Sequence, residues 1–285
     1  MLNEKEHVRT EIVSSVLENR LPLFWGLNRK SLKSTILYKT FIENGGCIRF
    51  KKDNYTLSIY NTLLTQTHKD VLEVLLCIRN DSLIQSFNMY DIFKILDKNS
   101  KNVDWLESII RDLTNTNIEI TYDDNPNHFK IFGIIDELEY ERNREEAVVK
   151  WNNSFISMYD TGAVLSYSKY LGNISNLNHD ITKQVVRWML TFSNLKISLR
   201  SLLVDKLGFT NVVTVRSINR YIIKIKEENL SVFGITLSSD KDPIISISRE
   251  KENVHFFNGE PIQEIKGIKE FKVKKYKKTS LFDLG

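Results

Sequence analysis

The stretch 210–230, TNVVTVRSINRYIIKIKEENL, constrains the fold more than any other part of the chain. Its aliphatic residues recur every three or four positions, which predicts one helix with a continuous apolar side. The opposite side carries Arg216, Ser217, Arg220 and Lys224, with no acidic residue among them. A small core can hold such a helix while its arginines face phosphates and guanine edges. On the helix alone, an ordinary surface helix with a solvated basic side is an equal alternative.

Length and composition indicate a folded protein with more than one domain. The chain has 285 residues, of which 41% are hydrophobic and 27% charged, and this length suits two domains of about 100–150 residues. It contains no membrane-length apolar run and no signal-peptide pattern, so we expect a cytoplasmic protein without a membrane partner. Cys47 and Cys77 have no neighbouring cysteine or histidine, which favours free thiols over a zinc site.

The first half of the sequence predicts helices followed by paired strands. A hairpin is expected at 46–61, helices at 64–80, 89–98 and 101–115, and strands at 117–122 and 129–140. Three helices followed by a hairpin are typical of a winged helix, in which the hairpin forms a wing behind a helix-turn-helix. The charged run 142–145 then predicts a joint between domains.

The second half repeats this order of elements. A strand is expected at 148–159, helices at 161–173, 179–193, 199–208 and 210–230, and a second wing at 231–249. We therefore predict an α+β, mostly helical protein with two tandem winged-helix domains, 1–143 and 144–265. The repeat favours the groove-binding interpretation of 210–230 over the solvated-face alternative.

This arrangement predicts which side chains contact DNA. In the second domain they are Asn211, Thr214, Arg216, Ser217, Arg220 and Lys224, with Lys241 at the wing tip. In the first domain the candidates are Lys98, Lys101, Asn102 and Arg111, among which acidic residues are mixed, so we expect mainly phosphate contacts there.

The tail 266–285 is strongly basic at its start. Residues 266–278 contain seven lysines and one acid, Glu270. Such a tail attracts nucleic acid through phosphate contacts and counterion release, although it can also be a solubilising end without a partner.

Several segments resemble the TrfA-type plasmid replication initiators. The resemblance is carried by LPLFWGLNRKSLKSTILY, LTQTHKDVLEVLL, LNHDITKQVVRWML and LRSLLVDKLGF, and it covers most of residues 21–240. It implies a tandem winged-helix protein that binds repeated sites in a plasmid origin and helps to melt the duplex. It further implies that the bound protein recruits the host replicative helicase and host initiator, and that monomer and dimer interconvert.

The end of the chain is similar to the short sliding-clamp peptide that some such initiators carry. Ser280, Leu281 and Phe282 match its last positions, whereas its glutamine and first leucine are missing. A Leu-Phe pair on a basic leash can fill an apolar pocket of a clamp. Alternatively, the pair packs on its own domain.

No arrangement of residues predicts catalysis. The five histidines are dispersed, and no glycine-rich phosphate loop is present. Asp242 with the triplet 264–266 fits a nuclease pattern only loosely, because such triplets are common in lysine-rich tails. We expect a protein without enzymatic activity, cofactor or metal. A transcriptional regulator that binds an operator without melting it is the alternative, and a protein–protein adaptor is a third.

Overall fold

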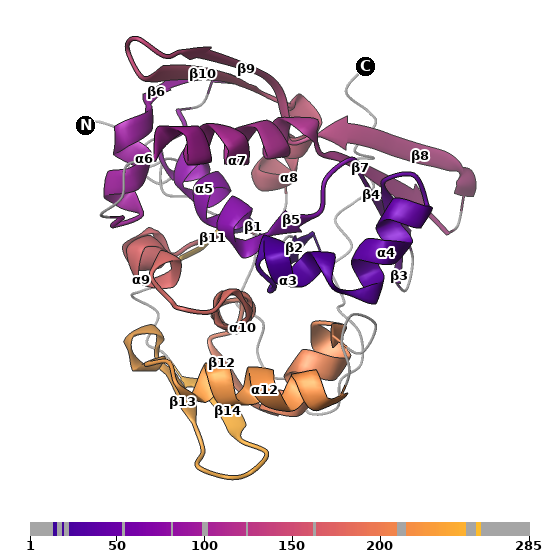
Figure 1. Cartoon of the computed structure of the whole chain (residues 1–285), viewed down its shortest axis with the longest axis vertical. Coiled ribbons are helices and arrows are strands. Elements are labelled where there is room, and N and C mark those ends of the chain that lie inside the picture. Colours follow the sequence, from indigo (N-terminus) through magenta and orange to yellow (C-terminus); the bar gives the residue numbers. More distant parts are fainter. Residues whose placement is uncertain are drawn as a thin grey trace.

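The computed structural model describes residues 14–15, 19, 23–52, 55–80, 82–98, 102–123, 125–161, 164–209, 215–248 and 255–257. Helices account for 45% and strands for 31% of the structure, so the fold is mixed α/β and not mostly helical as predicted. Figure 1 shows the amino-terminal half in the upper part of the molecule and most of the carboxyl-terminal half below it, although α8 (Asn153–Thr161) lies in the upper part.

The first half begins with short elements and a hairpin. These are β1 (Ser14–Ser15), β2 (Phe24–Trp25), α3 (Arg29–Lys33), α4 (Ile36–Glu43), β3 (Cys47–Lys52), β4 (Tyr55–Tyr60) and β5 (Leu64–Thr65). It continues with α5 (Gln66–Cys77), β6 (Ile84–Asn88), α6 (Met89–Ile95), α7 (Val103–Asn115), β7 (Asn117–Tyr122), β8 (Asn125–Gly133), β9 (Ile135–Glu141) and β10 (Glu146–Trp151). The predicted hairpin at 46–61 is confirmed, because β3 and β4 pair antiparallel.

The second half contains a similar set. It comprises α8 (Asn153–Thr161), β11 (Val164–Ser166), η1 (Ser168–Tyr170), α9 (Leu171–Ser175), α10 (Asp180–Leu190) and β12 (Asn194–Ser198). It continues with α11 (Leu199–Ser201), the π-helical η2 (Leu202–Lys206), α12 (Val215–Lys226), η4 (Ser231–Phe233), β13 (Ile235–Leu237), β14 (Ile244–Ser248) and β15 (His255–Phe257). Gly208, at φ +69°, follows η2 in the left-handed conformation that suits a helix end.

The two halves share one order of elements and one sheet topology. In the first half, α5, β6, α6, α7, β9 and β10 follow one another, and the sheet order is β6-β10-β9. In the second half, α10, β12, α11–η2, α12, β13 and β14 do the same, and the sheet order is β12-β14-β13. The hairpin β7–β8, which lies between α7 and β9, is an addition to the first half.

The strands after α7 pair differently from the prediction. β7 and β8 pair with each other, but β7 also pairs with β4, which gives a four-stranded sheet β3-β4-β7-β8. The run 129–140 divides at Ile134, which is fully buried, and its second part pairs with β10. The two strands predicted for the first wing are therefore divided between two sheets, because β8 belongs to one and β9 to the other.

The predicted joint at 142–145 lies in the turn of this hairpin. Glu141 and Glu146 face each other across it, and Ala147 pairs with Tyr140. A domain boundary between 143 and 144 would separate two strands that pair with each other. The run 142–145 is charged because it forms the exposed turn of a hairpin, and not because it joins two domains. The change from the first repeat to the second falls instead after Trp151, where α8 begins.

Two further segments differ from the prediction. The alternating run 148–159 is a strand only as far as Trp151 and then forms α8, because Asn152 Oδ1 accepts the backbone N–H groups of Ser154 and Phe155. Within 161–173, which was predicted helical, β11 pairs with β1 and β15, and helix begins only at η1.

A single hydrophobic core runs through both halves. It includes Trp25 and Leu75 from the first half and Trp188 and Ile222 from the second. The core side of α10 and of the residues after it consists of Ile181, Val185, Trp188, Met189 and Phe192, which are all buried. None of the helices in the described ranges has the length and apolar character that a bilayer crossing requires.

Candidate nucleic-acid interface

Helix α12 has the two-sided character that the sequence predicts. Ile218, Ile222 and Ile225 are buried, and the helix packs on α10 and α11. Residues 210–214, which include Asn211 and Thr214, lie outside the described residues.

The cations of α12 lie on its exposed side. Arg216, Arg220 and Lys224 are spaced four residues apart, which places them along one side of a helix. All three are exposed, and none has a hydrogen-bond or ion-pair partner within the described part of the chain. Ser217 is half-buried beside them. This side of α12 is therefore available to an external anion.

Neighbouring elements hold α12 in place and add to its charge. Arg200 of α11 donates a hydrogen bond to Asn219 Oδ1. Lys226 Nζ donates to the carbonyl oxygens of Ser239 and Asp240, at 3.4 and 3.3 Å, and so joins the end of α12 to the β13–β14 turn. Arg200 was not among the predicted DNA contacts, although it lies in the run LRSLLVDKLG, which was predicted as a helix.

The tip of the β13–β14 hairpin carries mixed charge. Lys241 is exposed there as expected, but Asp240 and Asp242 flank it. Asp240 accepts a hydrogen bond from the Ser238 hydroxyl at 2.8 Å, and Asp242 accepts one from Ser198 at 3.0 Å. These bonds order the turn and leave Lys241 as its exposed cation.

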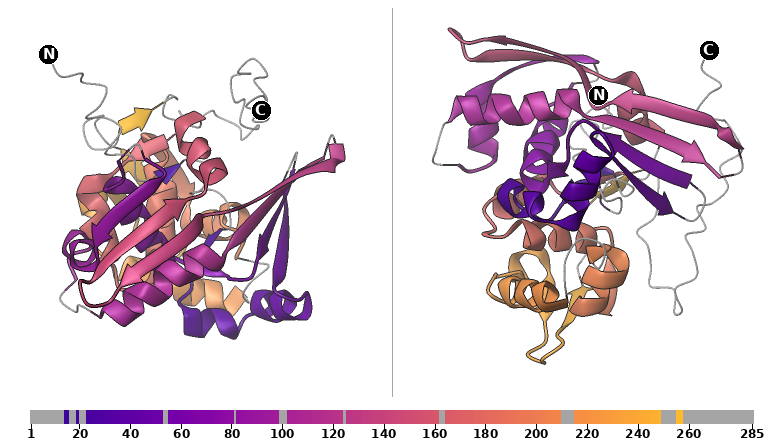
Figure 2. Two further views of the ribbon diagram at one scale, coloured as in Figure 1. Left: turned by 90° about the horizontal axis from the view of Figure 1, so that it is seen from above. Right: turned by 45° about the vertical axis from the view of Figure 1, so that its right-hand side comes forward.

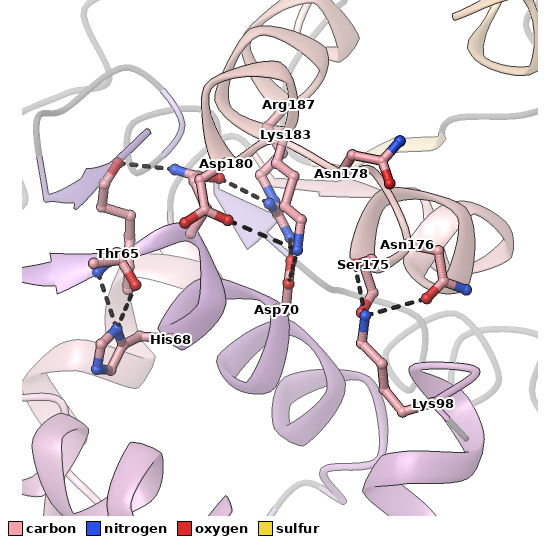
Figure 3. Close-up of polar contacts among 12 residues, drawn as sticks. Thr65, His68, Asp70, Lys98, Ser175, Asn176, Asn178, Asp180, Lys183 and Arg187 are labelled. Atoms are coloured by element: carbon pink, nitrogen blue, oxygen red, sulfur yellow. Dashed lines mark hydrogen bonds and ion pairs between the residues drawn. The ribbon is translucent and has the colours of Figure 1, made fainter. Parts of the chain in front are cut away.

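In the first half, the predicted DNA contacts are mostly engaged elsewhere. Lys98 Nζ donates to the Ser175 carbonyl oxygen at 2.8 Å and to Asn176 Oδ1 at 3.1 Å, and burial lowers its pKa. It therefore joins the two halves and does not face a ligand (Figure 3). Asn102 caps α7 by accepting the Trp105 N–H at 3.0 Å, and Lys101 lies outside the described residues.

Arg111 is the remaining candidate, and it forms an ion pair within its own helix. Its Nη2 lies 2.7 Å from Glu107 Oε1, and Arg142 contacts the other oxygen of the same carboxylate at 3.1 Å. Because the hydrogen bond from Arg111 outweighs the effect of burial, the pKa of Glu107 lies below its ordinary value. Arg111 and Arg142 are both largely exposed but already paired.

The outer side of the β9–β10 hairpin is acidic. Glu137, Glu139 and Glu141 are exposed on alternate positions of β9, and Glu146 on β10 faces Glu141. Phosphate groups are repelled by such a surface. The equivalent hairpins of the two halves therefore differ in charge, which the shared topology does not reveal.

A second group of cations lies on α3, which was not among the predicted sites. Lys30 and Lys33 are exposed, and Arg29, whose side chain is 63% exposed, lies 3.5 Å from Asp112 of α7. The available signal was the run Asn28 to Lys33, which combines a helix cap with three cations in five residues. Asn28 Oδ1 accepts the Ser31 N–H at 2.8 Å.

The two halves meet along α5 and α10, in a contact that we call the seam. Arg187 of α10 binds Glu73 of α5 through two nitrogens, at 2.6 to 3.0 Å, and Asp70 at 2.7 Å. Lys183 Nζ lies 2.5 Å from the other oxygen of Asp70 (Figure 3). Tyr167 donates a hydrogen bond to Glu73. All five side chains are buried.

The buried charges of the seam compensate each other. Burial alone raises the pKa of Asp70, but Lys183 and Arg187 outweigh it and hold this pKa below its ordinary value. Burial raises the pKa of Glu73, which Arg187 and Lys69 only partly offset. Such groups are tolerated in a core only when they are paired with good geometry. The seam therefore fixes how the two halves sit relative to each other.

Comparison with solved structures places this arrangement in context. A crystal structure of domains 2 and 3 of RctB superimposes with a TM-score of 0.54 and 13% sequence identity. The match covers 83% of this chain and 99% of the RctB chain. The chain is similar in fold to RctB domains 2 and 3. A second structure, RctB 155–483, covers 70% of this chain and 90% of its own at 10% identity, with a TM-score of 0.46.

Sequence comparisons give no relatives: no family model matches the chain, and no curated protein matches it. At 13% identity, the RctB similarity establishes the fold and not the site residues. The TrfA-type resemblance is not confirmed by these comparisons. The tail positions Ser280, Leu281 and Phe282, with all of 266–285, lie outside the described residues.

Proposed function

We propose that the protein is a DNA-binding replication initiator built from two winged-helix domains and without enzymatic activity. RctB, whose domains 2 and 3 share the fold, is a replication initiator. The repeated order of helix, strand, helix, helix and hairpin is the order of a winged helix, in which the third helix enters the major groove. In the second half this third helix is α12.

The observation that carries the proposal is the exposed cationic side of α12. Arg216, Arg220 and Lys224 have no partner among the described residues, although acidic residues are common elsewhere on the surface. Unpaired arginines on a groove-sized helix suit bidentate hydrogen bonds to guanine. Each such contact is worth roughly 1–3 kcal/mol of discrimination between bases.

As an initiator, the protein would bind repeated sites in a plasmid origin, help to melt the adjacent duplex and recruit the host helicase and host initiator. The similarity to RctB and the sequence resemblance to TrfA-type proteins support this proposal over a regulator. The proposal includes a cytoplasmic location and an exchange between monomer and dimer. The tail residues Ser280, Leu281 and Phe282 remain a prediction for clamp binding, which deletion of 280–285 tests by clamp capture.

The test begins with the full chain and a library of random 30-base-pair duplexes. We expect selection at 150 mM salt to enrich one sequence, and the double variant R216A/R220A to bind it at least tenfold more weakly and with less preference over random DNA. The matched control is R49A/R144A, which removes two exposed arginines from β3 and from the β9–β10 turn.

Three results would each contradict a different part of the proposal: DNA recognition, the role of α12, or melting. If the wild type enriches no sequence, DNA recognition is wrong. If R216A/R220A binds as the wild type does while the control is also normal, the role of α12 is wrong. If the enriched sequence beside an A·T-rich stretch shows no permanganate-reactive thymines in the presence of protein, occupancy without melting remains, and the protein is a regulator.

A further inference from the structure

We infer that α3, an element outside the two repeated units, is the phosphate-binding element of the first half. This inference rests on the proposed function and adds a second contact surface to it. Lys30 and Lys33 are exposed on a helix that carries no acidic residue in its first turn. Neither lysine has a hydrogen-bond or ion-pair partner in the described ranges.

The position of α3 is fixed from beneath. Leu32 is buried, and the preceding strand β2 pairs with β5 directly before α5. Gly26 lies so close to α10 that a Cβ atom built on it would meet Ile181 Cα at 3.1 Å. Gln66 of α5 donates a hydrogen bond to the Phe24 carbonyl oxygen at 2.8 Å. The segment before α3 is therefore clamped between α5 and α10, and α3 emerges at the seam.

This position brings α3 to the side of the molecule that α12 occupies. β2 contacts α10, and α10 contacts α12, so the three elements follow one another across the structure. Figure 1 shows α7, α3 and α12 toward the viewer, and the view from above in Figure 2 places them along one side. A duplex bound to α12 that extends toward the first half would therefore pass over α3.

The first-half cations that the sequence predicted as DNA contacts cannot replace α3 in this role. Lys98 is bound to the end of α9, and Arg111 and Arg142 share the carboxylate of Glu107. The outer side of β9 presents Glu137, Glu139 and Glu141, which phosphates avoid. Lys30 and Lys33 thus supply the unpaired positive charge that these candidates do not offer.

The chemistry of the contact defines what it does. Flexible lysine side chains act as point charges toward phosphates and do not distinguish bases. The α3 lysines would therefore strengthen binding to every duplex by a similar factor, whereas the arginines of α12 would select the sequence. The first half would act as a second anchor that fixes the direction of the duplex across the molecule.

The variant K30A/K33A tests this inference through the salt dependence of binding. Each phosphate contact contributes a slope of about −0.9 in log K against log [salt], so loss of two contacts makes the slope shallower by about 1.8. We expect weaker binding to specific and random duplexes by the same factor, with the enriched sequence unchanged. A charge-matched control, K94A/K150A, removes exposed lysines from α6 and β10 and should leave the slope as in the wild type.

The outcomes separate this inference from the proposed function. If wild-type protein binds DNA and R216A/R220A weakens it, but K30A/K33A retains the wild-type slope, the inference about α3 is wrong and the proposed function stands. If K94A/K150A makes the salt dependence as much shallower as K30A/K33A does, the contact is not specific to α3, and the inference fails. If the wild type binds no duplex, both fail. Circular dichroism of each variant checks that the exposed substitutions leave the fold intact.

Discussion

At the scale of single residues, whether a lysine or arginine is free to bind phosphate depends on partners that can lie far from it in the sequence. Lys98 looked available for phosphates, yet its partners Ser175 and Asn176 come from the other half of the chain. Arg111 looked equally available, but Glu107 lies one helical turn before it. Glu107 could be recognised as a partner from its four-residue spacing to Arg111, whereas the partners of Lys98 can be known only from the tertiary fold. Arg216 and Arg220 are exposed as predicted.

Glu107 provides a prediction for pH. Its pKa lies below the ordinary value of 4.5, chiefly because Arg111 donates hydrogen bonds to the carboxylate. The ion pairs therefore stabilise the fold above about pH 4.5, and their contribution is lost as the pH falls through the lower, folded pKa. We expect Glu107→Gln to lower the free energy of unfolding at pH 7, and the difference from wild type to shrink below pH 4.5. Urea unfolding across this range measures it.

The exposed Glu139 supplies the control for this comparison. Glu139→Gln should change the free energy of unfolding little at any of these pH values, because surface charges without fixed partners contribute little. A difference between wild type and Glu107→Gln that stays constant down to pH 3 would show that the ionised carboxylate does not carry the effect.

At the scale of elements, local patterns predicted those helices and strands whose partners lie nearby in sequence. The hairpins β3–β4 and β13–β14 and the helices α5, α10 and α12 follow from periodicity and turn residues. The run 129–140 was misread because a strand pattern does not say where a strand changes sheets. Segment 153–161 alternates like a strand, but the cap from Asn152 was a local signal for the helix that forms.

The close contact between β2 and α10 predicts a cost for a side chain at Gly26. An added Cβ would meet the side-chain amide oxygen of Gln184, which can turn away, and Ile181 Cα at 3.1 Å, so the backbone of α10 or of the Gly26 segment must give by a few tenths of an ångström. We expect Gly26→Ala to lower the free energy of unfolding by about 1–3 kcal/mol, as overpacked cores do. Thermal or urea unfolding measures the change.

Gly133 is the matched control, because its nearest atoms lie 3.6 Å from an added Cβ, which is ordinary contact. Gly133→Ala should cost clearly less than Gly26→Ala. Equal effects at the two positions would mean that backbone freedom, and not the approach of α10, explains the glycine at 26.

At the scale of the whole molecule, the seam was the feature that the sequence could not reveal. Glu73 and Arg187 lie on helices that were predicted, and from the sequence alone each would be taken for part of a solvent-exposed polar side. Both polar sides are internal because α5 packs against α10. The sequence does not show this packing, since 114 residues separate the two charges. The predicted division into two domains said nothing of this shared interior.

A double-mutant cycle tests what the seam contributes. We expect Arg187→Met to cost about 3–5 kcal/mol of unfolding free energy, since it leaves Glu73 and Asp70 buried without their main partner. The double variant Glu73→Met/Arg187→Met should cost clearly less than the sum of the two single variants, because it removes both charges together. Urea unfolding measures all four proteins.

Additive costs in this cycle would show that the two side chains are not coupled, which contradicts the geometry of the seam. Arg144→Met is the control for loss of an arginine, because Arg144 is 69% exposed and pairs only with the exposed Glu141 among the described residues. It should change the free energy by less than about 0.5 kcal/mol.

The buried charges between α5 and α10 also limit how such a protein can be recombined. A chimera that takes its amino-terminal half from one protein and its carboxyl-terminal half from another combines α5 and α10 from different parents, so their acidic and basic side chains need not pair. Each charge without a partner is then buried unpaired, which destabilises the fold. Exchange of target specificity by gene fusion should therefore succeed when the crossover lies beyond Leu190, so that both helices come from one parent.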